Sequence, residues 1–329
     1  MKNSTESKGF PPSYGTKKAA RINMIGPWLE THFGGKTIKL PLDGGFTCPN
    51  RDGTCGTGGC IFCSPAGSGE SAVSVSDDAA ASIEGIARKI AALQEKWPEA
   101  ERFLAYFQNY TSTYAPVERL RTLYTAALSY NEQVSGLPGA LPAGRIDGLV
   151  IATRPDCLPD GILDVLEEAA GRIPLYVELG LQTCDDVIAD SFGRGYKTHV
   201  YDEAVAALKS RGINVITHII FGLPGEDKEQ MLRSVKHAVE QGADGLKFTC
   251  LYILKNTRYE KLYEDGQIEG LDQQEYFDIV EEALKIVPQD TVIHRLTGDG
   301  PKSLLIAPMW TADKRQVINY INRRFKDLI

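Results

Sequence analysis

Short apolar runs along this chain alternate with longer segments in which apolar residues recur every third or fourth position. The segment 37–42 alternates apolar and polar side chains, which predicts a first strand. Continuous apolar runs predict five further strands, which we expect to be buried, at 103–107, 148–152, 175–181, 215–221 and 245–253. Helical spacing predicts helices around Ile83, Ile86, Ile90, Leu93 and Trp97 and over 117–130, 161–170, 199–210 and 226–241.

Strands of nearly continuous apolar character that alternate with amphipathic helices are typical of the α/β class, with a parallel sheet covered by helices. Six such units suit a full or partial TIM-like (β/α) barrel. Beyond residue 271 the pattern predicts a helix at 276–286, a strand at 291–296 and a final helix with one packed face. We therefore divide the chain into a flexible N-terminal lead (1–20), a barrel (21–270) and a C-terminal extension packed on the barrel (271–329).

Composition narrows the class of protein. The 329 residues are 43% hydrophobic and carry a formal net charge of −7, which argues against a generally basic nucleic-acid binder but leaves room for a local basic face. No run approaches the roughly 20 apolar residues that a bilayer span needs, and residues 1–9 lack the apolar core of a secretory signal. We expect a cytoplasmic protein that does not bind membranes.

A cysteine-rich loop at 46–64 holds four of the seven cysteines, Cys48, Cys55, Cys60 and Cys63, among glycines and turn residues. In a reducing compartment such a cluster favours a metal site over disulfides. Structural zinc prefers two close cysteine pairs, and only Cys60 and Cys63 form one. A plant-type ferredoxin cluster fits the spacing from Cys55 to Cys63 but needs a distant fourth cysteine. A third interpretation uses three thiolates on a four-iron cluster and leaves one iron open.

Polar residues gather where the predicted strands end. Ligands of parallel α/β folds bind at the carboxyl ends of strands, so we expect these side chains and the cysteine-rich loop to share one rim. The residues singled out are Gln108 and Thr111 after strand 103–107, Arg154 after 148–152, Glu178 and Gln182 on or after 175–181, and His218 on 215–221.

The motif C-P-N-R-D-G-T…G-G-C-I-F-C at 48–63 resembles the radical S-adenosylmethionine (SAM) superfamily, in the branch of the Elongator catalytic subunit and oxygen-independent coproporphyrinogen oxidase. V-E-L-G-L-Q-T at 177–183, Arg194 and H-I-I-F-G-L-P-G-E at 218–226 are similar to that branch's motifs. With H-R-L-T-G-D-G-P at 294–301, the chain most resembles a small bacterial subgroup of MnmL-type tRNA wobble-uridine enzymes. The resemblance covers about residues 30–327 and implies a partial (β/α)6 barrel of radical SAM type.

The resemblance also implies cofactors and site residues. Cys48, Cys60 and Cys63 align with the ligands of a [4Fe-4S] cluster, and Cys55 is an extra thiol. S-adenosylmethionine would bind the open iron and be cleaved to a 5′-deoxyadenosyl radical. The resemblance places Gln108 and Thr111 near the methionyl group, Arg194 on the carboxylate and Gln182 at the ribose, and it adds Glu178 and His218 to the cofactor site.

Several of these residues also have a structural interpretation from the sequence alone. Glu178 could be a buried structural partner, Arg194 a helix cap and His218 a core histidine with its hydrogen bonds satisfied. Cys157, Cys184 and Cys250 fit small, partly buried apolar positions.

The substrate is the least constrained expectation. The resemblance implies tRNA, with conversion of 5-carboxymethylaminomethyluridine to 5-aminomethyluridine, and an electron donor such as flavodoxin or ferredoxin. Basic side chains that could hold phosphates are Arg154, His294, Arg295 and Lys302. The alternatives are a radical reaction on a small molecule or tetrapyrrole, and a non-catalytic zinc or iron-sulfur binding protein.

Overall fold

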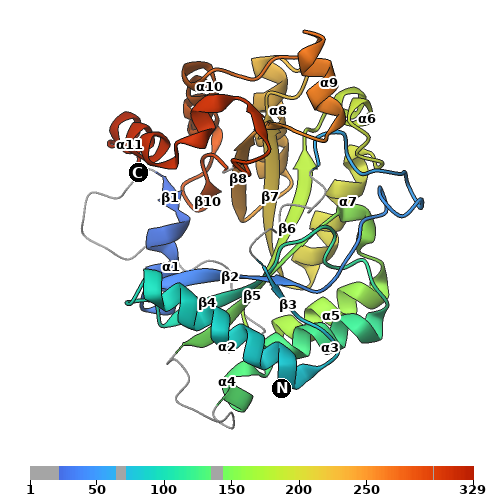
Figure 1. Ribbon diagram of the computed structural model, residues 1–329, viewed down its shortest axis with the longest axis vertical. Coiled ribbons are helices and arrows are strands. Elements are labelled where there is room, and N and C mark those ends of the chain that lie inside the picture. Colours follow the sequence, from blue (N-terminus) through green and yellow to red (C-terminus); the bar gives the residue numbers. More distant parts are fainter. Residues whose placement is uncertain (1–21, 64–71, 135–143, 299) are drawn as a thin grey trace, which may run out of the picture.

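Six parallel strands form the centre of the molecule and confirm the predicted α/β partial barrel. The computed structural model describes residues 22–63, 72–134, 144–298 and 300–329; the lead predicted for 1–20 lies outside these residues. The six strands are β2 (Thr37–Asp43), β4 (Arg102–Phe107), β5 (Arg145–Thr153), β6 (Leu175–Gln182), β7 (Asn214–Phe221) and β8 (Gly245–Cys250). With three shorter strands they make a nine-stranded sheet in the order β1-β10-β8-β7-β6-β5-β4-β2-β3, which curls into an open barrel (Figure 1).

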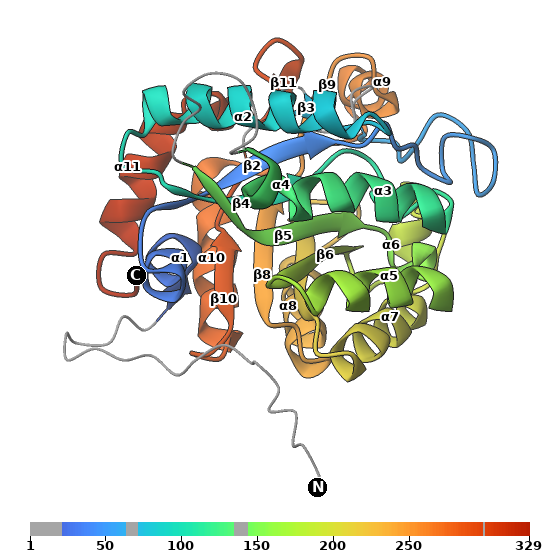
Figure 2. The ribbon, with the colours of Figure 1, turned by 90° about the horizontal axis from the view of Figure 1, so that it is seen from below.

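Helices cover the outer, convex face of this sheet (Figure 2). The apolar side chains that point outward from the strands, such as Leu40, Val177 and Val215, are fully buried against them. The covering helices are α2 (Ala79–Lys96), α3 (Val117–Leu128), α5 (Asp160–Ala170), α7 (Thr198–Ser210), α8 (Lys228–Glu240) and α10 (Gln273–Ile286). None of the helices in the described part of the chain has the length and apolar character that a bilayer crossing requires.

Helix α1 (Ile25–Phe33), which the sequence pattern did not single out, packs against the inner face of the sheet. Its Trp28 and Leu29 are buried in an apolar cluster with inward-facing residues of five strands. Those residues include Leu104 on β4, Tyr176 on β6 and Val292 on β10. The amino-terminal part of the barrel interior is therefore filled by apolar side chains, and the interior that remains for polar groups lies toward the carboxyl ends of the strands.

The C-terminal part requires a correction to the predicted division of the chain. Strand β10 (Val292–Arg295) pairs in parallel with β8, and the short strand β1 (Asn23–Met24) pairs with β10 on its other side. Residues 271–329 therefore contribute a strand to the barrel sheet and do not form only an extension outside it. The remaining elements are short or peripheral: β3 (Val73–Ser74), α4 (Tyr130–Gln133), α6 (Asp186–Ser191), β9 (Ile253–Leu254), α9 (Arg258–Glu264), β11 (Leu305–Ala307) and α11 (Lys314–Arg324).

The amino terminus of α8 is fixed by a reciprocal cap. Asp227 Oδ1 accepts from the Gln230 backbone N–H at 2.7 Å, and Gln230 Oε1 accepts from the Asp227 backbone N–H at 2.9 Å. We expect Asp227→Ala to lower the free energy of unfolding by about 1 kcal/mol, because it removes the side-chain acceptor of the Gln230 backbone N–H. Urea unfolding measures the change. Asp227→Asn keeps an acceptor and should lose less; an equal loss in both variants would assign the effect to the charge instead.

Candidate functional site

The cysteine-rich loop leaves the carboxyl end of β2 and lies against α6 (Figure 1). The Asn50 side-chain N–H2 donates to the carbonyl oxygens of Gly193 at 2.7 Å and Arg194 at 3.1 Å. The Phe62 ring packs against the rings of Phe192, at 5.3 Å between centroids, and Tyr259, at 6.4 Å. Both ends of the loop are thus attached to the rim of the barrel, as predicted from the sequence.

Each of the three predicted ligand sulfurs faces an N–H donor. Asn50 Nδ2 lies 3.2 Å from Cys60 Sγ, and Arg51 Nη2 lies 3.3 Å from Cys63 Sγ. Arg154 Nη1 lies 4.0 Å from Cys48 Sγ. Two guanidinium groups and a buried amide around three sulfurs suit anionic thiolates and the sulfides of an iron-sulfur cluster, whose properties depend on such hydrogen bonds.

The fourth thiol of the loop has a different environment. Cys55 is exposed, whereas Cys48, Cys60 and Cys63 are partly buried, and no N–H of the described residues faces its sulfur. Among the described residues no three His, Cys, Asp or Glu side chains are gathered as ligands of one metal ion. The donor pattern favours Cys48, Cys60 and Cys63 over Cys55 as cluster ligands.

Burial raises the pKa of Cys60 to about 11, the Asn50 hydrogen bond lowers it and the neighbouring Cys63 raises it. This thiol therefore holds its proton until a metal displaces it, as cysteine ligands do.

The end of β4 carries unsatisfied polar atoms. Thr111 is fully buried, and neither its Oγ1 nor Asn109 Oδ1 has a hydrogen-bond partner among the described residues. Buried polar groups in native proteins are almost always paired, so two orphans at one strand end indicate that a polar ligand completes them. Gln108 is partly exposed on the same strand end. These residues fit the amino-acid part of S-adenosylmethionine, which has both donors and acceptors.

The end of β6 has a strained backbone. Gln182 has φ +60°, a left-handed conformation that residues other than glycine adopt at a cost of about 1–3 kcal/mol, typically at functional sites. Its side chain folds over Gly180, where a Cβ would lie 2.2 Å from Gln182 Nε2. The Tyr196 hydroxyl is 3.2 Å from Gln182 Oε1 and also donates to the Gly180 carbonyl. The amide is therefore held at the rim, in a position from which it could contact a ribose.

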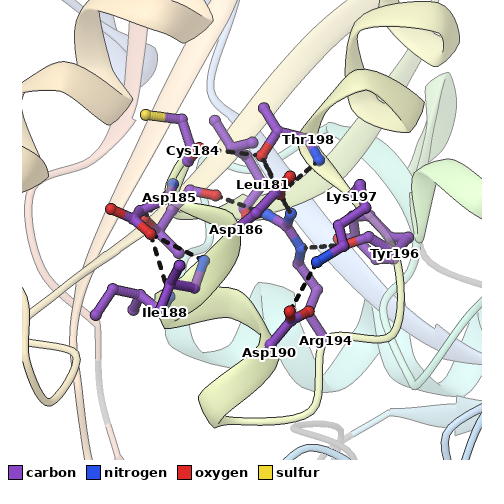
Figure 3. A network of polar contacts seen from close by, with 12 residues as sticks. Leu181, Cys184, Asp185, Asp186, Ile188, Asp190, Arg194, Tyr196, Lys197 and Thr198 are labelled. Carbon is purple, nitrogen blue, oxygen red and sulfur yellow. Dashed lines mark hydrogen bonds and ion pairs between the residues drawn. The ribbon is translucent and has the colours of Figure 1, made fainter.

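Arg194 has a different environment from the one expected (Figure 3). Its side chain is 1% exposed, and its guanidinium donates within the chain from all three nitrogens. Nε donates to the Tyr196 carbonyl, Nη1 to the carbonyls of Leu181 and Thr183, and Nη2 to Asp186 Oδ1 and Thr198 Oγ1, at 2.6–3.2 Å. Five bonds use all five N–H groups of a guanidinium. The structure thus contradicts direct pairing of Arg194 with a cofactor carboxylate and gives it a positioning role for the 181–198 turn.

Glu178 is likewise enclosed by the protein. It is 3% exposed and accepts from Lys39 Nζ at 2.5 Å, Lys247 Nζ at 2.8 Å and the Tyr106 hydroxyl at 2.5 Å. Burial would raise its pKa, but Lys247 and Lys39 hold the pKa well below the usual range of a glutamate. The structural interpretation of Glu178 is therefore correct, and its place in a cofactor site is not supported by these contacts.

His218 faces the barrel interior beside this group. Its Nε2 lies 2.8 Å from Thr249 Oγ1, and burial, with Lys247 and Arg295, lowers its pKa to about 3, so the imidazole is neutral. In the β6–β7 register His218 is opposite Gly180, and the next registered pair joins Ile219 to Gln182. A contact between His218 and a cofactor at the rim stays a prediction.

The four residues proposed to hold phosphates do not form one surface. Arg154 is bound through two nitrogens to Asp156, at 2.7 and 2.9 Å, and its remaining nitrogen points to Cys48. His294 and Arg295 lie inside the barrel, as described below, and Lys302 is exposed. Arg154, His294 and Arg295 are not exposed as Lys302 is, so the four residues do not form one phosphate-binding surface, and a substrate contact by any of them stays a prediction.

Sequence reasoning missed several residues of this rim. Asn50 and Arg51, which face the sulfurs, directly follow Cys48-Pro49, so their position inside the motif was the available signal. Tyr196 carries no motif signal. Glu226 ends the motif at 218–226 and lines a cavity of about 810 Å³. Burial raises the pKa of its carboxyl to about 7, against the opposing effect of Thr183.

Comparison with known proteins agrees with this geometry. Residues 52–238 match the profile of the Radical SAM superfamily, and residues 243–327 match that of the Radical_SAM C-terminal domain. The chain is 40% identical over 322 residues to the uncharacterized protein YtqA of Bacillus subtilis (strain 168), an alignment that covers 98% of this chain and 94% of that protein.

Two more distant similarities involve Elongator proteins. The chain is 28% identical to Elongator complex protein 3 of Drosophila melanogaster over 55% of its own length and 32% of the length of that protein. The structure of the archaeal Methanocaldococcus infernus Elp3 with an N-terminal deletion is similar at a TM-score of 0.62 and 16% identity, covering 88% of this chain and 63% of that chain. At that identity the structural similarity establishes a common fold.

Proposed function

The chain belongs to the radical SAM superfamily, and from this premise we propose that it is a radical SAM enzyme that modifies the wobble uridine of tRNA. A bound [4Fe-4S] cluster would supply the electron that cleaves S-adenosylmethionine to methionine and a 5′-deoxyadenosyl radical, which takes a hydrogen atom from the substrate. The proposed reaction oxidises the carbon between the amine and the carboxylate of 5-carboxymethylaminomethyluridine to an imine, which water hydrolyses to 5-aminomethyluridine and glyoxylate. S-adenosylmethionine is the oxidant and leaves as methionine and 5′-deoxyadenosine.

The observation that carries the proposal is the set of N–H donors around Cys48, Cys60 and Cys63. Three thiols, each facing an amide or guanidinium, sit at the carboxyl-end rim of a parallel barrel. Three cysteine ligands leave one iron of a four-iron cluster free for S-adenosylmethionine. A closed tetrahedral zinc site would instead need a fourth ligand, and Cys55 is exposed and turned to solvent.

The chain's own residues have distinct tasks in this proposal. Asn50, Arg51 and Arg154 would hold the sulfurs by hydrogen bonds and offset their negative charge. Thr111 after β4 and Gln182 at the end of β6, on either side of the end of β5, would orient the cofactor. The apolar packing of Phe62 against Phe192 and Tyr259 would keep water from one side of the site, which protects a radical from side reactions.

The tRNA substrate rests on the loops C-P-N-R-D-G-T and H-R-L-T-G-D-G-P, which resemble the wobble-uridine subgroup, and on the similarity to Elongator complex protein 3. An electron donor such as flavodoxin or ferredoxin belongs to the same proposal, because reductive cleavage of S-adenosylmethionine consumes an electron.

Mass spectrometry of tRNA nucleosides from a strain lacking this protein tests the substrate. We expect 5-carboxymethylaminomethyluridine to accumulate and 5-aminomethyluridine and its derivatives to disappear. A plasmid copy of the wild type should restore them, and a Cys60→Ala copy should not. Unchanged wobble uridines in the deletion strain would overturn the tRNA assignment and favour a small-molecule or tetrapyrrole substrate.

A further inference from the structure

Several residues that face the interior of the barrel are partly exposed to solvent. Along β7 and β8 the partly exposed mid-strand residues are His218 and Lys247, and along β5 and β6 they are Ala152 and Gly180. All four face inward, whereas their outward-facing neighbours are buried against the helices. We call the space bounded by these residues and by Lys39 of β2 the lumen. It lies next to the rim, because the Gly180–His218 pair immediately precedes the Gln182–Ile219 pair in the β6–β7 register.

The lumen contains more positive than negative charge. Lys39 and Lys247 share the single carboxylate of Glu178, with side-chain exposures of 26%, 12% and 3%. Arg295 adds a third cation, close enough to lower the pKa of both His218 and Lys247. No second carboxylate of the described residues pairs with any of these cations, so the group carries a surplus of positive charge.

A bulge in β10 turns two successive side chains into the lumen. The β8–β10 register shifts between Ile293 and Arg295, so Arg295 is opposite the inward-facing Lys247, and the His294 ring lies against inward-facing Gly245. Bulges of this kind re-aim side chains and occur beside active sites. Without the bulge, strand alternation would direct one of the two residues outward.

Neither of these two side chains has a polar partner among the residues that the structure describes. Within that part of the chain both ring nitrogens of His294 are buried without a hydrogen bond, and Arg295 makes no hydrogen bond or ion pair. A guanidinium has five donors, and leaving them unpaired in a partly desolvated interior is costly. Burial likewise lowers the pKa of Lys247 to about 8 against the opposing effect of Glu178. The arrangement is that of a site prepared for an anion.

We propose that the lumen, through Arg295 with Lys39, Lys247 and His294, binds a carboxylate of the substrate. This inference rests on the proposed function, because the nucleoside 5-carboxymethylaminomethyluridine carries one carboxylate at the end of the side chain that is shortened. Seating that carboxylate in the lumen would point the carbon atoms of the side chain toward the rim, where the radical is generated.

Geometry favours a flat carboxylate over other anions. Arg295 presents a planar fork that matches a carboxylate with two parallel hydrogen bonds. Gly298 lies beside this group, since a Cβ there would come within 3.3 Å of Arg295 Nη1.

Thermal unfolding of the reconstituted full-length protein with malonate tests the site without requiring any reaction. At equal ionic strength, malonate should raise the melting temperature of the wild type and of Arg88→Gln, a control on the exposed face of α2, more than sodium chloride does. Arg295→Gln should lose this response while keeping its iron content and its circular dichroism spectrum. Should Arg295→Gln fail to fold, Arg295→Lys should fold and show a reduced response. An undiminished response in the Arg295 variant, or a larger response to inorganic phosphate than to malonate, would overturn the carboxylate site.

Nucleoside binding then links the lumen to the proposed substrate. The wild type should bind 5-carboxymethylaminomethyluridine at least about tenfold more tightly than the corresponding carboxamide, since hydrogen bonds to charged groups have that magnitude. Arg295→Gln should abolish the difference and Arg88→Gln should keep it. Equal affinity of the wild type for acid and amide would overturn the inference for this substrate.

The two proposals can fail separately. If the deletion strain shows unchanged wobble uridines while malonate still stabilises the wild type and not Arg295→Gln, the tRNA assignment is wrong and the carboxylate site stands for another carboxylate substrate. If the uridines change as expected while Arg295→Gln responds to malonate like the wild type, the lumen inference is wrong and the proposed function stands.

Discussion

Replacing Cys60 by alanine is expected to abolish both the iron-sulfur cluster and S-adenosylmethionine cleavage. Its sulfur is the one that Asn50 holds at 3.2 Å while the same amide binds the backbone at Gly193 and Arg194. Removal of the thiol therefore takes away a ligand from the best-anchored point of the loop, and two remaining thiolates do not hold a four-iron cluster. Anaerobic reconstitution followed by iron and sulfide analysis and chromatography of 5′-deoxyadenosine measures both losses.

Cys55→Ala is the matched control, because it removes a thiol from the same loop. Cys55 is exposed and no described N–H faces its sulfur, so this variant should retain about one cluster per chain and wild-type formation of 5′-deoxyadenosine. Loss of the cluster in Cys55→Ala together with retention in Cys48→Ala would exchange the two residues in the ligand set. If Cys60→Ala still bound metal, and that metal were zinc and not iron, the result would instead support a non-catalytic metal protein.

Most of the fold could be predicted from the sequence because the pattern that encodes it is local. The outward faces of β6 and β7 are fully buried, and both strands appear within one residue of their predicted ends. Helix α1 was missed because it is short. Its apolar residues contact the inner face of the sheet, and the apolar pattern of the strands does not indicate that a helix packs there. The location of β10 in the sheet was missed for a related reason, because sequence pattern gives a strand but not its neighbours.

The candidate site also has a part that the sequence predicts and a part that it does not. The loop with Cys48, Cys60 and Cys63 was predictable because spacing and residue type suffice to define metal ligands. The facing directions of His294 and Arg295 were not, since they depend on a bulge that leaves no mark in the apolar pattern. Motif position alone also does not define the role of a long polar side chain that can point either into the protein or toward the cofactor, as Arg194 shows.

Replacing Arg194 by glutamine is expected to destabilise the protein more than any other single change considered above except loss of the cluster. Five acceptors, three of them backbone carbonyls, depend on this one buried guanidinium. Leaving a buried acceptor without its donor costs about 1–3 kcal/mol, whereas loss of the ion pair adds less, because Asp186 is 41% exposed and also accepts from Thr198. We expect a large fall in melting temperature, measured on the anaerobically prepared protein, and a loss of soluble yield.

The variant Arg194→Lys separates this positioning role from direct cofactor binding. Lysine keeps the charge that a SAM carboxylate would need but offers three donors in place of five and no planar fork, so it cannot replace the bonds to Leu181, Thr183 and Tyr196 together. We therefore expect Arg194→Lys to melt well below the wild type yet to show an almost unchanged KM for S-adenosylmethionine in the fraction that folds. Arg88→Gln, on the exposed face of α2, should change neither quantity. An unchanged melting temperature with a strongly raised KM would return Arg194 to the cofactor site, because only a group that contacts the cofactor could affect binding while leaving the 181–198 turn intact.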